Sequence, residues 1–273
     1  MGILTFKGGV HPYDGKELSK NSPVVKYLPK GDMVYPLSQH IGAPAVPLVA
    51  KGDRVLMGQK IAEGQAFISA NIHSSVSGTV KSIEPRLTAT GMKVNAIVVE
   101  NDGLYESVEI EPQTKSIDEL EASEIRALVK EAGVVGMGGA GFPTHVKLSP
   151  KNEGDIDTII VNGAECEPYL TSDYRRMLEE TDKLIDGLKI VLRIFPKAKG
   201  HIAIEDNKPD AIKLLRERTQ GEDRIVVDAL KTKYPQGGER CLIYAVAKRK
   251  INSSMLPADA GCIVPVSYTH LTL

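Results

Sequence analysis

The chain has 273 residues and a formal net charge of −1, from 34 Lys and Arg against 35 Asp and Glu. This near-neutral balance argues against nucleic acid as the main partner, because phosphate binding usually needs a basic excess or a basic stripe. The cysteines, Cys166, Cys241 and Cys262, form no Cys-x-x-Cys pair, which argues against a disulfide framework and against an iron–sulfur cluster held by this chain alone. No apolar run approaches the roughly 20 residues that span a bilayer and no secretory signal is visible, so we expect a cytoplasmic protein.

The N-terminal third of the chain predicts a small β domain. Short segments rich in Val and Ile alternate with Gly and Pro turn signals, which is typical of short strands. The expected strands are Val46–Val49, Arg54–Met57, Ala66–Ala70, Gly78–Ile83 and Val94–Val99. Strands this short and this closely spaced indicate a compact sandwich or barrel.

Two motifs in this region resemble those of the biotinyl/lipoyl-type barrel-sandwich domains. They are GDRVLMGQ at Gly52–Gln59 and GTV at Gly78–Val80. A carrier domain of that family presents a modifiable lysine at a hairpin tip between the motifs, whereas Ala66–Ser75 contains no lysine. The resemblance therefore implies a structural or docking module rather than a swinging arm.

The composition changes after Asn101. The acidic stretch Glu106–Pro112 ends at a proline, which predicts a linker over residues 105–115. Beyond the linker, Ser116–Glu119 fits a helix capping box, and Gly133 is expected just past the end of that helix.

Strands and helices then alternate. Thr158–Val161 is a continuous apolar run, as expected for a strand that is covered on both faces. Further strands are expected at His201–Ile204 and Arg224–Val227, and helices at Ser172–Phe195, Asn207–Arg218 (with Asn207 as a cap) and Leu242–Ala247. Two strand–helix–strand units predict a parallel sheet, so the fold class is a Rossmann-like α/β domain preceded by a small all-β barrel-sandwich domain. The expected division is a β domain at 1–104, a linker at 105–115, an α/β domain at 116–264 and a tail at 265–273, which the family resemblance given below implies is non-native.

A glycine-rich segment, Gly136–Lys147, is the first candidate ligand site. It matches G-x-G-x-x-G, but a helix rather than a strand precedes it and no Gly-Lys-Ser/Thr follows, which excludes a standard dinucleotide fingerprint and a P-loop. Such glycines allow backbone N–H groups to approach an anion closely, and Lys147 adds a cation. The alternative is a plain turn that joins a helix to a strand. The candidate residues are Gly136, Gly138, Gly139, Gly141, Phe142 and Lys147.

Two further segments follow predicted strands, at the edge where open α/β sheets bind ligands. In NGAECEPY (Asn162–Tyr169), the amide of Asn162 and the carboxylates of Glu165 and Glu167 suit ribose hydroxyls or ring N–H groups. The alternative for this segment is a solvated acidic loop. In YPQGGER, the candidates are Tyr234, Gly237 and Glu239, and the alternative is an ordinary loop that opens a helix.

In this order the segments resemble the RnfC family of the Rnf complex, the bacterial ion-translocating ferredoxin:NAD oxidoreductase. They resemble more distantly the flavin subunit of respiratory complex I. The Rnf resemblance runs from FKGGVHP (Phe6–Pro12) to PADAGCIV (Pro257–Val264). It implies FMN and NADH as cofactor and substrate, other Rnf subunits as partners, and a peripheral position on the cytoplasmic face of the membrane.

The flavin subunit of complex I implies roles for individual positions. Its glycine loop and the following lysine contact FMN, which implies such roles for Gly136, Gly138 and Lys147, and its loop Phe stacks on the NADH adenine, which implies that role for Phe142. Its two other motifs imply flavin or nucleotide contacts for Asn162, Glu165, Glu167, Tyr234, Gly237 and Glu239. This chain departs from them at Ala164 and Gly238, where complex I has acids.

The implied reaction is hydride transfer from NADH to FMN, then one-electron steps to ferredoxin, with no side-chain nucleophile and no metal held by this chain. In the Rnf family two 4Fe-4S clusters follow, and we expect them beyond the region present here. A cobalamin reductase of bacterial microcompartments is the alternative enzyme, although FKGGVHP favours Rnf. A non-catalytic docking scaffold is the other alternative, which Ala164 and Gly238 favour.

Overall fold

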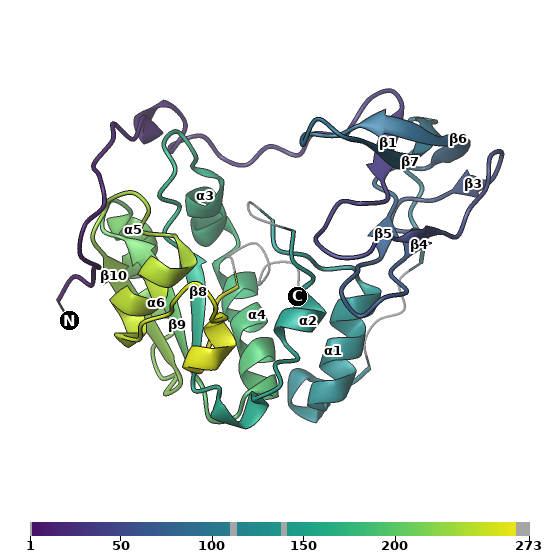
Figure 1. Ribbon diagram of the computed structural model, residues 1–273. Helices are drawn as coiled ribbons and strands as arrows, with labels where there is room; N and C mark the ends of the chain where they lie inside the picture. The colour runs from purple at the N-terminus through teal and green to yellow at the C-terminus, as the bar shows by residue number, and fades with distance from the viewer. Residues whose placement is uncertain (1, 110–113, 138–140, 266–273) are drawn as a thin grey trace. The chain divides into compact units, whose positions relative to one another are not determined.

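The computed structural model describes residues 2–109, 114–137 and 141–265 (Figure 1). The chain forms two compact units. The α/β unit combines Met1–Val25 with the chain from Leu148 onward, and the β unit is Lys26–Lys147. No helix within the described ranges is long and apolar enough to cross a membrane.

The β unit contains two antiparallel sheets, with strand orders β1-β7-β6-β3 and β2-β4-β5. The strands are β1 (Met33–Pro36), β2 (Val46–Pro47), β3 (Arg54–Val55), β4 (Lys60–Glu63), β5 (Ile72–His73), β6 (Gly78–Leu87) and β7 (Lys93–Asn101). Val80 and Ile97 of the first sheet and Ile61 of the second belong to one buried cluster. The two sheets therefore share a core, and the predicted barrel-sandwich architecture is confirmed.

The strand predictions in this unit were correct for four segments and wrong for one. β2, β3, β6 and β7 overlap the expected strands, whereas Ala66–Ala70 is not a strand. Here side chains take the place of ladder partners, because Asn71 Oδ1 accepts from the Gly64 N–H at 3.0 Å and Ser69 Oγ donates to the Ala43 carbonyl at 2.8 Å. β1, β4 and β5 were missed, since none of them has a clean alternation of apolar and polar residues over several positions.

The helices after the predicted linker pack with the β unit. They are the 3-10 helix η2 (Ile117–Glu119), α1 (Ala122–Glu131) and α2 (Thr144–Lys147). The predicted capping box at Ser116 is present, although it caps η2, and Gly133 follows α1 with a φ of 67° as expected. Glu131 joins α1 to the strands, through an ion pair with Lys60 at 2.7 Å and a hydrogen bond from Asn71 Nδ2 to its carbonyl at 3.1 Å.

The compact units differ from the predicted domains at both ends of the β unit. Residues 116–147 group with the strands, and the first 25 residues group with the α/β unit. In the latter, Leu4 pairs with Leu230, and Val10 pairs with Tyr234. Where the functional domains begin and end stays a prediction.

The α/β unit is built on a parallel sheet with strand order β10-β9-β8-β11 (Figure 1). Its strands are β8 (Thr158–Gly163), β9 (Lys199–Glu205), β10 (Ile225–Leu230) and β11 (Cys262–Ile263). Its helices are η1 (Lys16–Leu18), η3 (Glu153–Asp155), α3 (Ser172–Glu179), α4 (Thr181–Ile194), α5 (Pro209–Arg218), α6 (Glu239–Ala247) and η4 (Pro257–Ala260).

Helices cover both faces of this sheet. On one face, Leu242 of α6 shares a buried cluster with Ile160 and Ala203. On the other face, Leu188 of α4 lies over Gly200, whose missing side chain makes room for it. The predicted parallel α/β fold is therefore confirmed, with β8 buried as its apolar run indicated.

Two local predictions in this unit were wrong. The expected helix over 172–195 is two helices, because the backbone leaves the helical region at Glu180 (φ −127°, ψ 34°). The helix α5 is not capped by Asn207, since Lys208 is its N-cap residue and Pro209 starts it. The tail prediction lies outside the described residues beyond Pro265.

Candidate functional site

Two predicted segments meet at the carboxyl end of β8. Asn162 Nδ2 donates to the Gly237 carbonyl at 2.9 Å, and the Gly237 N–H donates to Cys166 Sγ at 3.3 Å. We call this set the loop contact (Asn162, Cys166 and Gly237). A Cβ on Gly237 would lie only 3.3 Å from Asn162 Oδ1 and from Cys166 Sγ, so glycine is what allows this approach. The structure thus brings two sequence-predicted site residues, Asn162 and Gly237, together.

Gln236 lies next to the loop contact and was missed from the sequence. It is 0% exposed, and within the described residues neither its Oε1 nor its Nε2 has a hydrogen-bond partner. A buried amide whose donor and acceptor have no partner can hydrogen-bond the edge of a heterocycle, which offers a complementary acceptor and donor. No local pattern marks this residue, because a Gln in a glycine turn usually faces solvent.

The two glutamates of the first segment point to different surroundings. Glu167 is exposed, whereas Glu165 is 6% exposed with a φ of 48°. Glu165 Oε1 accepts from the Asp173 N–H at 2.7 Å, and its Oε2 has no hydrogen-bond partner among the described residues. Burial raises the pKa of Glu165 to about 7, so its carboxyl gains a proton far more readily than an exposed one.

The segment Tyr234–Glu239 presents its remaining candidates outward. Tyr234 and Glu239 are both exposed, and Tyr234 is fixed by backbone hydrogen bonds in both directions with Val10, each 2.8 Å. Gly238 is the N-cap residue of α6. The predicted ordinary loop before a helix and the predicted ligand loop are thus both compatible with this backbone.

The glycine segment belongs to the β unit. Within it, the Gly136 N–H donates to the Phe142 carbonyl at 2.9 Å and closes the glycine loop. Gly141 has a φ of 63° and packs so closely on Gln39 that a Cβ would lie 3.0 Å from the Gln39 carbonyl oxygen. Lys147 is the last residue of α2. Gly138 and Gly139 lie outside the described residues.

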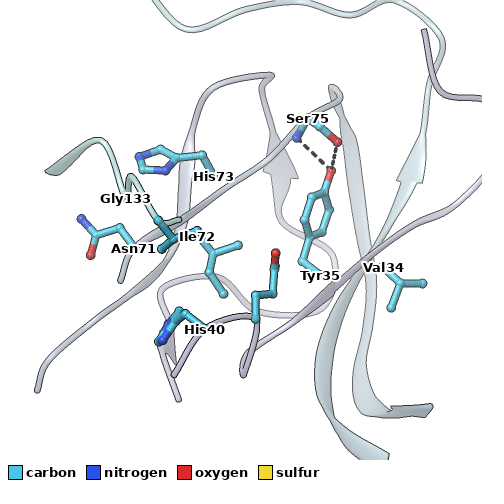
Figure 2. Close-up of a pocket in the computed structure, with 10 residues that line it drawn as sticks. Val34, Tyr35, His40, Asn71, Ile72, His73, Ser75 and Gly133 are labelled. Carbon is cyan, nitrogen blue, oxygen red and sulfur yellow. Dashed lines mark hydrogen bonds between the residues drawn. The ribbon is translucent and has the colours of Figure 1, made fainter. Parts of the chain in front are cut away.

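A cavity of about 410 Å³ lies beside this segment in the β unit (Figure 2). Gly133 and Val135 line one side of it, and the phenol of Tyr35 is held by the N–H and hydroxyl of Ser75, both at 2.9 Å. His73 also lines it, and burial lowers the pKa of that imidazole. Among the described residues, the lining is polar but carries no Asp, Glu, Lys or Arg side chain.

His40, another residue of the cavity lining, is already satisfied. Its Nε2 accepts from the Ala70 N–H and its Nδ1 donates to the Ile41 carbonyl, both at 3.1 Å, which fixes a neutral tautomer. His145, which lies in the glycine motif, is buried and donates from Nε2 to the Phe67 carbonyl at 3.1 Å. Both imidazoles therefore act as structural ties within the β unit.

The thiol of Cys166 and the candidate metal ligands were examined for reactivity in the described ranges. Burial raises the pKa of the Cys166 thiol to about 11, so it remains protonated, as expected for a small buried thiol. No group of three or more His, Cys, Asp or Glu side chains that could hold a metal occurs in the described part of the chain.

Comparison with known proteins gives two family matches. Residues 129–271 match the Nuo51 FMN-binding domain, and residues 4–104 match the RnfC barrel sandwich hybrid domain. A subunit of the proton-translocating ferredoxin:NAD(+) oxidoreductase complex of Clostridium ljungdahlii is 47% identical over 263 residues, covering 96% of this chain and 57% of that protein. The corresponding protein of the Na(+)-translocating complex of Acetobacterium woodii is 44% identical over 264 residues, covering 95% of this chain and 59% of that protein.

A more distant relative shows the same partial coverage. It is a subunit of the ion-translocating oxidoreductase complex of Haemophilus influenzae (strain PittEE), and it is 37% identical over 265 residues, covering 96% of this chain and 40% of that protein. The chain therefore spans between 40% and 59% of the length of these three relatives.

Proposed function

Because this chain belongs to the Nuo51 FMN-binding domain family and carries an RnfC barrel sandwich hybrid domain, we propose that it is the FMN- and NADH-binding part of an Rnf-type ferredoxin:NAD oxidoreductase. The relatives that share this arrangement are named as subunits of such complexes. The single observation that carries the proposal is the loop contact, where two motifs far apart in sequence close on each other beside Gln236, whose buried amide has no partner within the described residues.

The residues of the α/β unit fit the ring of FMN better than its phosphate. Within the described residues the Gln236 amide keeps a free donor and a free acceptor, and Gly237 lets its loop close on Asn162 and Cys166. FMN, when bound, would supply the redox chemistry, namely two-electron exchange with NADH and one-electron exchange onward. Asn162, Gln236 and Gly237 would hold and orient the ring and exclude water from it.

The glycine segment is the proposed anion site. Backbone N–H groups contributed by Gly138, Gly139 and Gly141 would bind a nucleotide phosphate, Gly136 would shape the loop through its hydrogen bond to Phe142, and Lys147 would add positive charge. Phe142 would stack on the NADH adenine, by resemblance to the complex I flavin subunit. Among the acids, the exposed Glu167 and Glu239 are better placed than the buried Glu165 to accept from ribose hydroxyls. Tyr234, which is also exposed, belongs to the same segment as Glu239.

The partners and location follow from the same proposal. The chain would bind other Rnf subunits and lie peripherally on the cytoplasmic face of a bacterial membrane. The 4Fe-4S clusters would belong to the part of the relatives that this chain does not span. The barrel-sandwich module would then serve as the docking part.

FMN binding by the purified chain tests the proposal. Titration followed by flavin fluorescence should give a dissociation constant in the micromolar range or below. Asn162→Ala removes the donor to Gly237 and should weaken binding at least tenfold, about 1.4 kcal/mol. Asn21→Ala, at an exposed position of the same unit, should bind like the wild type.

Absence of FMN binding by a folded chain would contradict the proposal. If the wild-type chain is folded by circular dichroism and binds no FMN at micromolar protein, the flavin assignment is wrong. The docking scaffold would then be the better interpretation of the same fold.

A further inference from the structure

The ammonium group of Lys16 is buried beneath the loop that begins at Asn162. Lys16 is 6% exposed and comes from the N-terminal segment, far from the loop in sequence. Its Nζ donates to the carbonyls of Glu165 at 2.9 Å, Glu167 at 3.0 Å and Leu170 at 2.6 Å. All three hydrogens of the ammonium are therefore donated to carbonyls of one stretch of backbone. We call this stretch the acidic loop (Asn162–Leu170).

Lys208 also holds this loop through a buried ammonium group. It is 1% exposed, and its Nζ donates to the Ala164 carbonyl at 2.7 Å and to Asn207 Oδ1 at 3.0 Å. The Glu205 carboxylate lies 3.6 Å away and balances its charge. An ammonium buried without partners is strongly unfavourable, so the carbonyls of the loop are held where both lysines need them.

The N-terminal segment fits the acidic loop at more than one point. The Tyr169 N–H donates to the Asp14 carbonyl at 2.6 Å. A Cβ on Gly15 would collide with the Tyr169 ring, so the segment passes close only because residue 15 is glycine. At the end of the loop, the Ser19 hydroxyl lies 2.8 Å from that of Thr171.

The loop needs such support because its backbone is strained. Glu165 and Tyr169 have φ values of 48° and 67°, a region that non-glycine residues rarely occupy. Conformations of this kind persist only where the surroundings fix them. The carbonyls that Lys16 binds belong to Glu165 itself and to residues on both sides of Tyr169.

We propose that Lys16 is a positioning residue for the flavin site: its ammonium fixes the acidic loop, and thereby holds Asn162 and Cys166 against Gly237. Lys16 touches no ligand and acts through the loop. Its role at the flavin site rests on the proposed function, whereas its hold on the loop does not.

Amide hydrogen exchange and FMN titration of matched variants test this proposal. Lys16→Met keeps the buried stem but removes the donors, and it should speed exchange at the hydrogen-bonded amides of Tyr169 and Asp173 at least tenfold. The same variant should weaken FMN binding at least tenfold and alter the visible absorption band of bound FMN. Lys16→Arg, which keeps a cationic donor, should show exchange rates and FMN affinity close to those of the wild type. Lys20→Met, an exposed lysine of the same segment, should match the wild type.

Each other outcome has a defined meaning. Wild-type exchange rates in Lys16→Met would overturn the proposal, and so would loosened exchange with unchanged FMN affinity and spectrum. If no variant binds FMN but Lys16→Met still loosens the loop, the proposed function fails while the hold on the loop stands. If Lys16→Met does not fold, Lys16→Gln, which keeps an amide donor, should give a smaller acceleration, and wild-type exchange there would equally overturn the proposal.

Discussion

At Gly237 the space for a side chain is already taken. A Cβ there would meet Asn162 Oδ1 and Cys166 Sγ at 3.3 Å, so alanine must displace the Asn162 amide by a few tenths of an ångström. Gly237→Ala is expected to weaken FMN binding about tenfold and to lower the free energy of unfolding by about 1 kcal/mol. Fluorescence titration and urea unfolding measure the two effects.

A matched control is available at Gly154. A Cβ at that position has no neighbour within 4 Å, so Gly154→Ala should bind FMN like the wild type. Equal affinity in the two alanine variants would contradict a role for the loop contact in holding the flavin.

Glu165 makes stability depend on pH in a defined window. Its pKa is raised from 4.5 to about 7, chiefly by burial, so between these values the folded state holds a proton that the unfolded chain has lost. The stabilisation from this proton is complete below pH 4.5 and is lost as the pH rises through about 7. Glu165→Gln mimics the protonated carboxyl and should be more stable than the wild type at pH 8, with the difference shrinking towards pH 4.5.

Urea unfolding of both proteins at several pH values checks this expectation. Parallel curves for the wild type and Glu165→Gln across the window would show that Glu165 does not titrate as its burial implies.

The sequence predicted the site residues that lie in motifs, but it did not predict the buried lysines that hold the acidic loop. Asn162 and Gly237 follow from glycine turns after apolar strands, and the structure brings them together. Lys16 and Lys208 were missed because a lysine's burial leaves no mark on its own sequence. The Lys16 hydrogen bond to Glu165 spans 149 positions, a separation that no local pattern reports.

At the scale of elements, the junction of α1 with the β sheets depends on Gly133. This residue has a φ of 67°, and a Cβ there would collide with the Asn71 carbonyl. Gly133→Ala combines a penalty of about 1 kcal/mol for the left-handed backbone with this collision, so we expect a loss of roughly 3 kcal/mol of unfolding free energy. Thermal and urea unfolding followed by circular dichroism measure it.

Gly103 separates the two contributions. It has a φ of 72°, but a Cβ there has no neighbour within 4 Å, so Gly103→Ala should lose only about 1 kcal/mol. If the two alanine variants lose the same amount, the packing of Gly133 on Asn71 does not stabilise the unit.

Element predictions succeeded where the local signal agreed with the tertiary environment. The apolar run before Asn162 and the turn at Gly133 were both predicted correctly. The split between α3 and α4 was not, because the apolar period continues across Glu180 while the backbone there does not. Short strands such as β5 also depend on pairing partners more than on their own residues.

At the scale of the whole molecule, the candidate residues predicted from the sequence are divided between the two compact units. The glycine segment groups with the β unit, and the acidic loop belongs to the α/β unit. The sequence predicts both segments within one functional domain at 116–264, and that division stays a prediction, because grouping by contacts reports which strands a segment packs on and not where a functional domain begins. Gly141 packs on Gln39, and Asn71 bonds to Glu131, which ties the glycine segment and α1 to the strands.

We propose that this chain binds FMN and accepts a hydride from NADH. The most direct measurement is anaerobic mixing of the FMN-loaded chain with NADH, followed by the visible absorbance of the bound flavin. We predict that NADH bleaches the flavin and that NADPH at the same concentration does so far more slowly. Bound FMN that NADH leaves oxidised, or that only NADPH reduces, would contradict the claim.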